Sequence, residues 1–347
     1  MSALKFGILL PNSGSLANAK AIRQVAIKAE ELGLDSVWVH DHISYGSDWL
    51  GHRASGLAEQ ITEAAEPVFH ESVNTLSFVA GFTDRILLGT AMIVLPLRNP
   101  LVLGRQLITL QALSQGRLIL GVAAGDYPAE FNVMNVPYET RGAITDEYLE
   151  VLCKILHGGS VSYYGKNVHF EDGQFYPKVN SPPVIVGGGV IAVPEPDDDK
   201  LSIPALRRAA KYGDGWMPDW GRPELIERGV KTIKDLARNY GKEHSSFQVA
   251  FSTAFHLADR DEDALRATAK SIEFAEREAN VVAKYGVRTP RKTLERSLIG
   301  SRRTVAERIQ EYALAGVSHF SLVPLARDID SLLRMMEKFG KEVMTSF

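Results

Sequence analysis

Cysteine is almost absent from this sequence. Cys153 is the only one among 347 residues, which excludes an intramolecular disulfide framework and any cysteine-rich metal centre. No apolar run approaches the roughly 20 residues that cross a bilayer as a helix. The first residues, MSALKFGILLP, lack the basic start, long apolar segment and small-residue cleavage site of a secretory leader. We therefore expect a cytoplasmic protein with no membrane partner.

An excess of positive charge is missing as well. Lysine and arginine number 39 against 42 aspartates and glutamates, for a formal net charge of −3. Proteins that bind nucleic acid usually carry a basic surface, so we expect no nucleic-acid partner. The dinucleotide-binding fingerprint GxGxxG is absent after the first apolar run, where Pro11-Asn12-Ser13-Gly14 stands instead. This absence disfavours a nicotinamide-binding Rossmann domain.

Short apolar runs alternate with stretches of helical periodicity along the whole chain. Eight strand–helix units imply a parallel sheet with right-handed crossovers, closed into a (β/α)8 TIM barrel. We expect a single domain over residues 1–347, with insertions after strand two (44–66) and after strand seven (261–298). The predicted strands are 5–10, 36–39, 86–95, 118–123, 183–186, 215–217, 247–257 and 320–323. The predicted helices are 19–32, 67–82, 99–113, 143–156, 206–212, 224–240, 303–315 and 329–343.

The carboxyl ends of the strands carry the candidate site residues, because active sites of such barrels lie at that end. Strand two is followed by His40-Asp41-His42, in which the two histidines alternate to one side and Asp41 to the other. A histidine there suits proton transfer, but it can equally be structural. As a metal site, the motif lacks a third ligand at sensible spacing, so we expect no metal.

Glycines mark two further strand ends. Gly187-Gly188-Gly189 follows strand five and serves either as an anion-binding nest of backbone N–H groups or as a tight turn. Strand four leads into Gly125-Asp126. Within strand three, the small residues Gly89-Thr90-Ala91 interrupt an apolar run. Small side chains there let a ligand or another chain segment approach the backbone closely.

Together these motifs resemble the luciferase-like monooxygenase superfamily of FMN- and deazaflavin-dependent enzymes. The resemblance covers almost the whole chain, and the motifs that carry it are KFGILLP, AEELGLDSVWVHDH, DRILLGTAMIVLPLRNP, LSQGRLILGVAAGDYPAEF, RGAITDEYLEVL, PPVIVGGG, RRAAKYGDGW and RRTVAERIQEYALAGVSHFSL. It implies a non-proline cis peptide at Ala91–Met92, in a bulge that presses on the cofactor ring.

The resemblance also assigns roles to single residues. It makes His42 the active-site histidine and places Asp126 where some members have a glutamate general acid, although aspartate reaches less far. Cofactor contacts are implied at Asp41, Ala91, Met92, Gly125, Gly187, Gly188, Gly189 and Val190. An acidic insertion at 190–204 departs from the common pattern and puts phosphate contacts beyond Val190 in doubt.

The expected activity is that of an oxidoreductase with a non-covalent deazaflavin coenzyme (F420), which exchanges hydride with a small organic substrate. The alternative is an FMN-dependent monooxygenase that inserts one atom of O2 and receives reduced flavin from a separate reductase. The HDH motif, GVAAGD and Ala124 in place of an arginine favour the first. Two other readings are a non-catalytic flavoprotein and a metal-dependent hydrolase that uses His40, His42 and Asp126. By analogy with the family, we expect a homodimer.

Overall fold

The computed structural model describes residues 3–44, 68–191, 199–218, 221–242, 246–269 and 295–347. Most of the predicted insertion after strand two (44–66), and residues 270–294 of the one after strand seven, lie outside the described residues. Within the described part of the chain, no helix is both long and apolar enough to cross a membrane.

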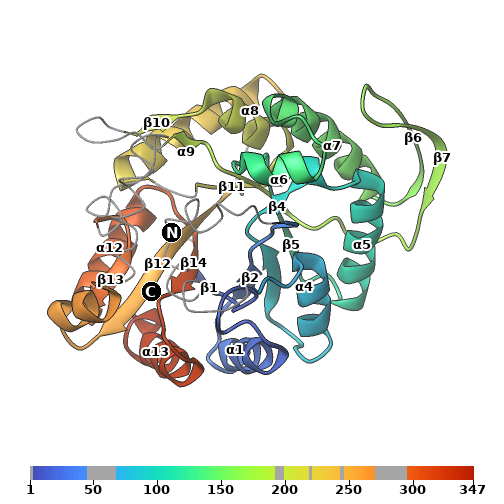
Figure 1. Ribbon diagram of the computed structural model, residues 1–347. Helices are drawn as coiled ribbons and strands as arrows, with labels where there is room; N and C mark the ends of the chain where they lie inside the picture. Colours follow the sequence, from blue (N-terminus) through green and yellow to red (C-terminus); the bar gives the residue numbers. More distant parts are fainter. Residues whose placement is uncertain (1–2, 45–67, 192–198, 219–220, 243–245, 270–294) are drawn as a thin grey trace.

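Eight parallel strands close into a barrel, and helices form a ring outside it (Figure 1). The barrel closes because the first strand (5–9) pairs with the last (319–324). The last strand also pairs with the strand at 248–258, which in turn pairs with the strand at 215–217. The fold is therefore a (β/α)8 TIM barrel. In order around the barrel, the strands are β1 (Lys5–Leu9), β2 (Ser36–Val39), β3 (Leu87–Thr90) continued by β4 (Ile93–Val94), β5 (Leu118–Ala123), β8 (Val184–Gly187), β11 (Gly215–Met217), β12 (Gln248–Ala258) and β14 (His319–Pro324).

The helices begin and end where local signals in the sequence place them. The Asn18 side chain caps the first helix by accepting from Ala21 N–H at 2.9 Å, and Gly33 follows its end with φ +77°. Asn99 caps another helix, with Pro100 at its first position. The helices are α1 (Ala19–Glu31), α4 (Ser72–Ala80), α5 (Pro100–Leu113), α6 (Pro128–Val133), α7 (Arg141–Ile155), α8 (Ile203–Tyr212), α9 (Pro223–Arg238), α12 (Arg302–Leu314) and α13 (Ile329–Glu342); residues 261–269 are also helical.

The structure departs from the predicted pattern in several places. Predicted strand three (86–95) is two short strands separated by Ala91 and Met92, and a 3-10 turn (Leu95–Leu97) follows. An antiparallel hairpin of β6 (Gly159–Tyr164) and β7 (His169–Phe175) projects from the barrel (Figure 1). A further strand, β13 (Leu298–Ser301), pairs with the end of β12. Sequence reasoning missed the hairpin because its side chains are largely exposed. Its two strands therefore lack the run of apolar residues that marks a strand packed against the core.

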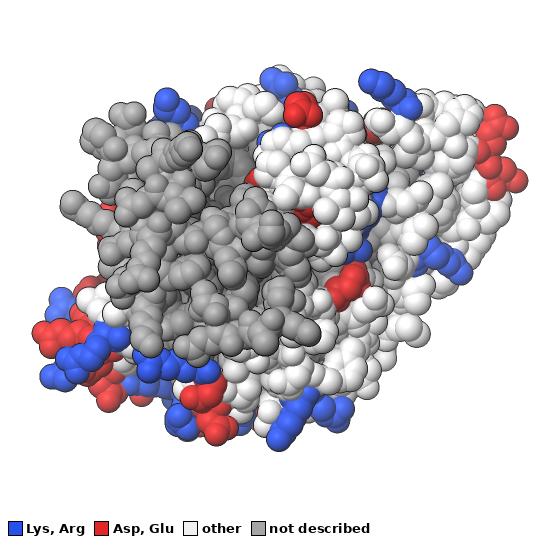
Figure 2. Space-filling view, viewed as in Figure 1, with Lys and Arg blue, Asp and Glu red and all other residues white. Residues whose placement is uncertain are grey.

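The core has two layers. Side chains that point outward from the strands pack against the helices in one large apolar cluster. A smaller cluster fills the barrel itself, made of Leu9, Trp38, Ala91, Ile119, Ile185, Met217, Ala250 and Val323. Ala91 thus belongs to the barrel interior. On the face shown in Figure 2, charged side chains of both signs are interspersed around the rim, in keeping with the small net charge.

Candidate active site

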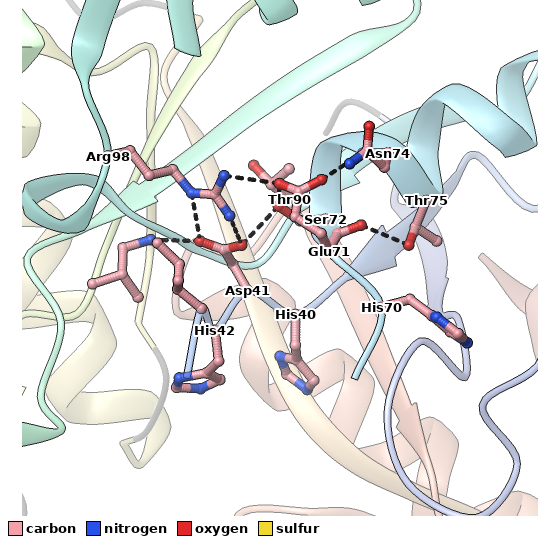
Figure 3. A network of polar contacts seen from close by, with 12 residues as sticks. His40, Asp41, His42, His70, Glu71, Ser72, Asn74, Thr75, Thr90 and Arg98 are labelled. Carbon is pink, nitrogen blue, oxygen red and sulfur yellow. Dashed lines mark hydrogen bonds and ion pairs between the residues drawn. The ribbon is translucent and has the colours of Figure 1, made fainter. Parts of the chain in front are cut away.

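Residues that follow β2, β3 and β5 in the chain meet at the carboxyl end of the barrel. His40 Nδ1 lies 2.9 Å from the carbonyl oxygen of Ala91, and His42 Nδ1 lies 3.0 Å from Glu130 Oε2 on α6. Figure 3 shows both imidazoles on one side of the strand end and the Asp41 carboxylate on the other. The predicted alternation of this motif is confirmed.

The Ala91–Met92 peptide bond is cis, as the family resemblance implied. The Thr90 hydroxyl bridges the break in the ladder beside it, since it donates to Gly121 O and accepts from Gly121 N–H, both at 2.8 Å. The Met92 side chain packs against Gly121 and Gly187, and any larger residue at either position would collide with it. A Cβ atom on Gly121 would lie 2.9 Å from Met92 Cε, and one on Gly187 would lie 2.6 Å from Met92 Cγ. The ends of β3, β5 and β8 therefore fit together only because these two positions are glycine.

Glu130 is the site residue that sequence reasoning missed. Its side chain is 1% exposed and accepts hydrogen bonds from His42 Nδ1 and, at 2.5 Å, from the Ile43 N–H. The Phe69 ring meets the His42 imidazole edge to face, with centroids 5.6 Å apart. Because a carboxylate only accepts, the proton of a neutral His42 lies on Nδ1 and Nε2 becomes the nitrogen that exchanges protons. A local signal existed in the sequence: Pro128 opens a short helix after strand four, and Glu130 lies in its first turn beside apolar Phe131.

Asp126 lies at the same end of the barrel but is exposed. Its backbone carbonyl accepts from the Tyr138 hydroxyl at 3.2 Å, and burial raises the pKa of Tyr138. The preceding residue, Gly125, has φ +80°, and its carbonyl accepts from Arg141 Nε at 3.0 Å. The general-acid role of Asp126 and the cofactor contact of Gly125 stay predictions.

The glycine triplet begins with Gly187, the last residue of β8, and the two glycines that follow have a left-handed backbone, with φ +83° at Gly188 and +97° at Gly189. The Gly188 N–H donates to Met217 O at 3.1 Å, so this amide is already used. The space where a Gly188 side chain would stand is open. Val190 pairs with Leu201, and the neighbouring bond from Ser202 N–H to Gly189 O makes this a non-hydrogen-bonded pair. The Val190 N–H therefore points away from its partner strand.

The 190–204 insertion does not displace the helix that follows it. It forms a hairpin of β9 (Val190–Ile191) and β10 (Lys200–Leu201), which returns the chain to its starting point. Ser202, the N-cap of α8, thereby lies beside Gly189 at a hydrogen-bond distance of 2.9 Å. No side chain caps α8, and the backbone N–H groups at an uncapped helix start suit an anion. The Ser202–Gly189 bond places this helix start next to the glycine loop.

Asp41 is enclosed by protein. Its side chain has no exposed surface, and it accepts from Ser72 Oγ at 2.8 Å, from Val94 N–H at 3.1 Å and from the Arg98 guanidinium. Burial opposes the charge of Arg98, but the carboxylates of Asp41 and Glu71 outweigh it and raise the pKa of Arg98. The implied contact of Asp41 with a cofactor stays a prediction, and the geometry is that of a buried ion pair. In the described ranges, no three histidine, cysteine, aspartate or glutamate side chains come together as a metal site.

Comparison with known proteins identifies a family and several relatives. The family model of the luciferase-like monooxygenases matches residues 4–319. An uncharacterized protein of Mycobacterium tuberculosis is 28% identical over 222 residues, which are 63% of this chain and 72% of that protein. The F420-dependent glucose-6-phosphate dehydrogenase of Amycolatopsis mediterranei is 27% identical over 247 residues, which are 64% of this chain and 65% of that enzyme.

Solved structures share the fold over nearly the full length. The monooxygenase RslO1 of Streptomyces bottropensis has a TM-score of 0.77 at 21% identity, with 99% of each chain covered. An F420-dependent secondary alcohol dehydrogenase, solved with an F420-acetone adduct, has a TM-score of 0.77 at 18% identity, with 98% of each covered. The oxygenating constituent of 3,6-diketocamphane monooxygenase of Pseudomonas putida, solved with FMN, has a TM-score of 0.71 at 19% identity, with 99% of each covered. The chain belongs to the luciferase-like monooxygenase family and is an oxidoreductase of that class.

Proposed function

We propose that this enzyme uses the deazaflavin coenzyme F420 to exchange hydride with a small organic substrate. The observation that carries the proposal is the pairing of His42 Nδ1 with the buried Glu130 carboxylate at the barrel mouth. This pairing fixes the imidazole so that Nε2 can give or take the proton that accompanies a hydride. The proposal is supported by the F420-dependent enzymes among the relatives and structural neighbours and by Ala124, which stands where an arginine would favour FMN.

The residues present fit such a cofactor. The cofactor ring would lie against Ala91, which lines the barrel interior, and Met92, which packs against Gly121 and Gly187. The cofactor phosphate would bind at the Gly188–Val190 loop, where the space beside Gly188 is open, and at the uncapped N-terminus of α8, which together form the proposed phosphate cradle. When bound, the deazaflavin supplies the hydride chemistry. His42, with Asp126 as the predicted second group, handles the proton on the substrate oxygen, carbon or nitrogen, while the small residues of β3 leave room for the ring.

The second candidate is an FMN-dependent monooxygenase that draws reduced flavin from a separate reductase. It is favoured by the structural likeness to two monooxygenases, one of them solved with FMN. The same phosphate cradle and the same histidine would serve both cofactors, so the two functions differ in the cofactor that the site accepts.

Titration of the purified protein with F420 and with FMN, followed separately by fluorescence or anisotropy, tests the proposal. Tight binding of F420 with weak binding of FMN is the expected result, and it directs substrate screens to alcohols and to reducible alkenes, imines and carbonyls. The reverse preference would replace the proposal with the monooxygenase. Binding of neither cofactor would overturn both.

A further inference from the structure

The backbone from Ala91 to Val94 is held at both ends by two adjacent residues that directly follow β2. His40 Nδ1 donates to Ala91 O at 2.9 Å, and Asp41 Oδ2 accepts from Val94 N–H at 3.1 Å. Only Met92 and Ile93 lie between the two anchored positions. The end of β2 thereby fixes the position of the segment against which the cofactor ring is proposed to lie.

The rest of the Asp41 carboxylate is bound to protein groups that face away from the histidines (Figure 3). Arg98 donates to it through Nε, at 3.2 Å, and through Nη2. Arg98 Nη1 in turn contacts Glu71 Oε1 at 2.8 Å. Glu71 is the N-cap of α4, since its Oε2 accepts from Asn74 N–H at 2.7 Å. One ion-pair network therefore ties β2, the β4 segment and the start of α4 to one another.

We propose that Asp41 and Arg98 are positioning residues that act on the cofactor site through the backbone of the Ala91–Val94 segment. With no exposed surface, the Asp41 carboxylate offers nothing for a ligand to contact. The Val94 bond and the Arg98 pair hold the far end of the segment, as His40 holds the near end. This clamp, made of His40, Asp41 and Arg98, sets how Met92 meets a bound ring. The inference rests on the proposed function for its catalytic meaning, and on the contacts alone for its structural part.

The structural part is tested in cofactor-free protein by hydrogen exchange of the Val94 amide. A hydrogen bond to a charged group corresponds to about 10- to 100-fold in an opening equilibrium, so Asp41→Asn is expected to speed this exchange by that factor. Asp41→Leu combined with Arg98→Met removes both buried charges, which guards against simple misfolding, and it should also leave Val94 fast. Asp199→Asn is the matched control, because Asp199 and Arg296 form another Arg–Asp pair with side chains 2% and 3% exposed. Unchanged Val94 exchange in the double variant would overturn the proposal.

The functional part is tested with whichever cofactor the wild-type protein binds. Arg98→Met keeps the Asp41 carboxylate but removes the guanidinium that holds it. If Arg98 acts as a positioning residue, the Kd of the cofactor should weaken about tenfold and the visible circular dichroism of the bound ring should change. Unchanged Kd and unchanged circular dichroism in Arg98→Met would overturn the proposal. Failure of wild-type protein to bind either cofactor would refute the proposed function instead, while the exchange experiment would still decide on the clamp.

Discussion

Glu130→Gln is the sharpest test of how His42 is held. The Glu130 carboxylate accepts from His42 Nδ1 at 3.0 Å and from the Ile43 N–H at 2.5 Å. Glutamine has the same shape, but only one of its two terminal atoms accepts. When that oxygen keeps the Ile43 bond, the amide NH2 group faces His42 and donates to it. The neutral imidazole must then accept at Nδ1 and carry its proton on Nε2, which is the opposite tautomer.

The size of the effect follows from the bond that is lost. A protonated His42 donates to a carboxylate that is 1% exposed, and such charge-assisted hydrogen bonds contribute about 1.5–3 kcal/mol. Since 1.4 kcal/mol is a factor of ten in rate, a proton-transfer step through His42 should slow by about 10- to 100-fold. Binding of the cofactor should stay within about threefold, because the substitution changes neither the shape of α6 nor the glycine loop.

Two measurements check this prediction. The 15N chemical shifts of the His42 ring in cofactor-free protein report the tautomer, and kcat with the preferred cofactor reports the proton step. Glu147→Gln is the matched control, since Glu147 also accepts from backbone N–H groups, those of Asn167 and Val168, away from the site. An unchanged tautomer together with unchanged kcat in Glu130→Gln would refute the reasoning.

Three further predictions have definite expected outcomes. Burial, helped by the charge of Lys5, lowers the pKa of His319 from 6.5 to about 3. Because only the unfolded chain takes up this proton below pH 6.5, stability falls by about 2 kcal/mol between neutral pH and pH 5. His319→Gln should abolish that loss in urea titrations, and an equal loss in both proteins would contradict it. Gly121→Ala would place Cβ 1.9 Å from Thr90 O, so thermal melts should show a destabilisation of about 1–3 kcal/mol, whereas an unchanged melting temperature would not fit. Gly188→Ala and Gly33→Ala strain similar backbones, with φ +83° and +77° and open space at each Cβ; both should lose about 1–2 kcal/mol of stability, but only Gly188→Ala should weaken cofactor binding in the fluorescence titration.

The barrel was predictable because its signals are local. Apolar periodicity, asparagine caps and glycine stops act within one turn or one strand, and the ranges predicted for β2, β5 and β11 agree with the structure. The same alternation of predicted strands and helices located the strand ends that carry His42, Asp126 and the glycine triplet. The cis peptide at Ala91–Met92 came from the family resemblance, since residue types alone indicated only a close approach.

Contacts between distant segments were decided by tertiary structure. Glu130 reaches His42 across 88 positions in the sequence, and no periodicity links a residue of α6 to the end of β2. The hairpin of the 190–204 insertion likewise brings Ser202 back to Gly189, which the acidic composition of the insertion did not suggest. The family resemblance implied a cofactor contact at Asp41, and only the structure shows that Arg98, 57 positions away, pairs with its carboxylate. The sequence by itself determined which residues arrive at the mouth of the barrel, because strand and helix patterns are short-range. Only the packed structure decided which of them face one another, because hydrogen bonds and ion pairs form between whatever groups the closed barrel brings together.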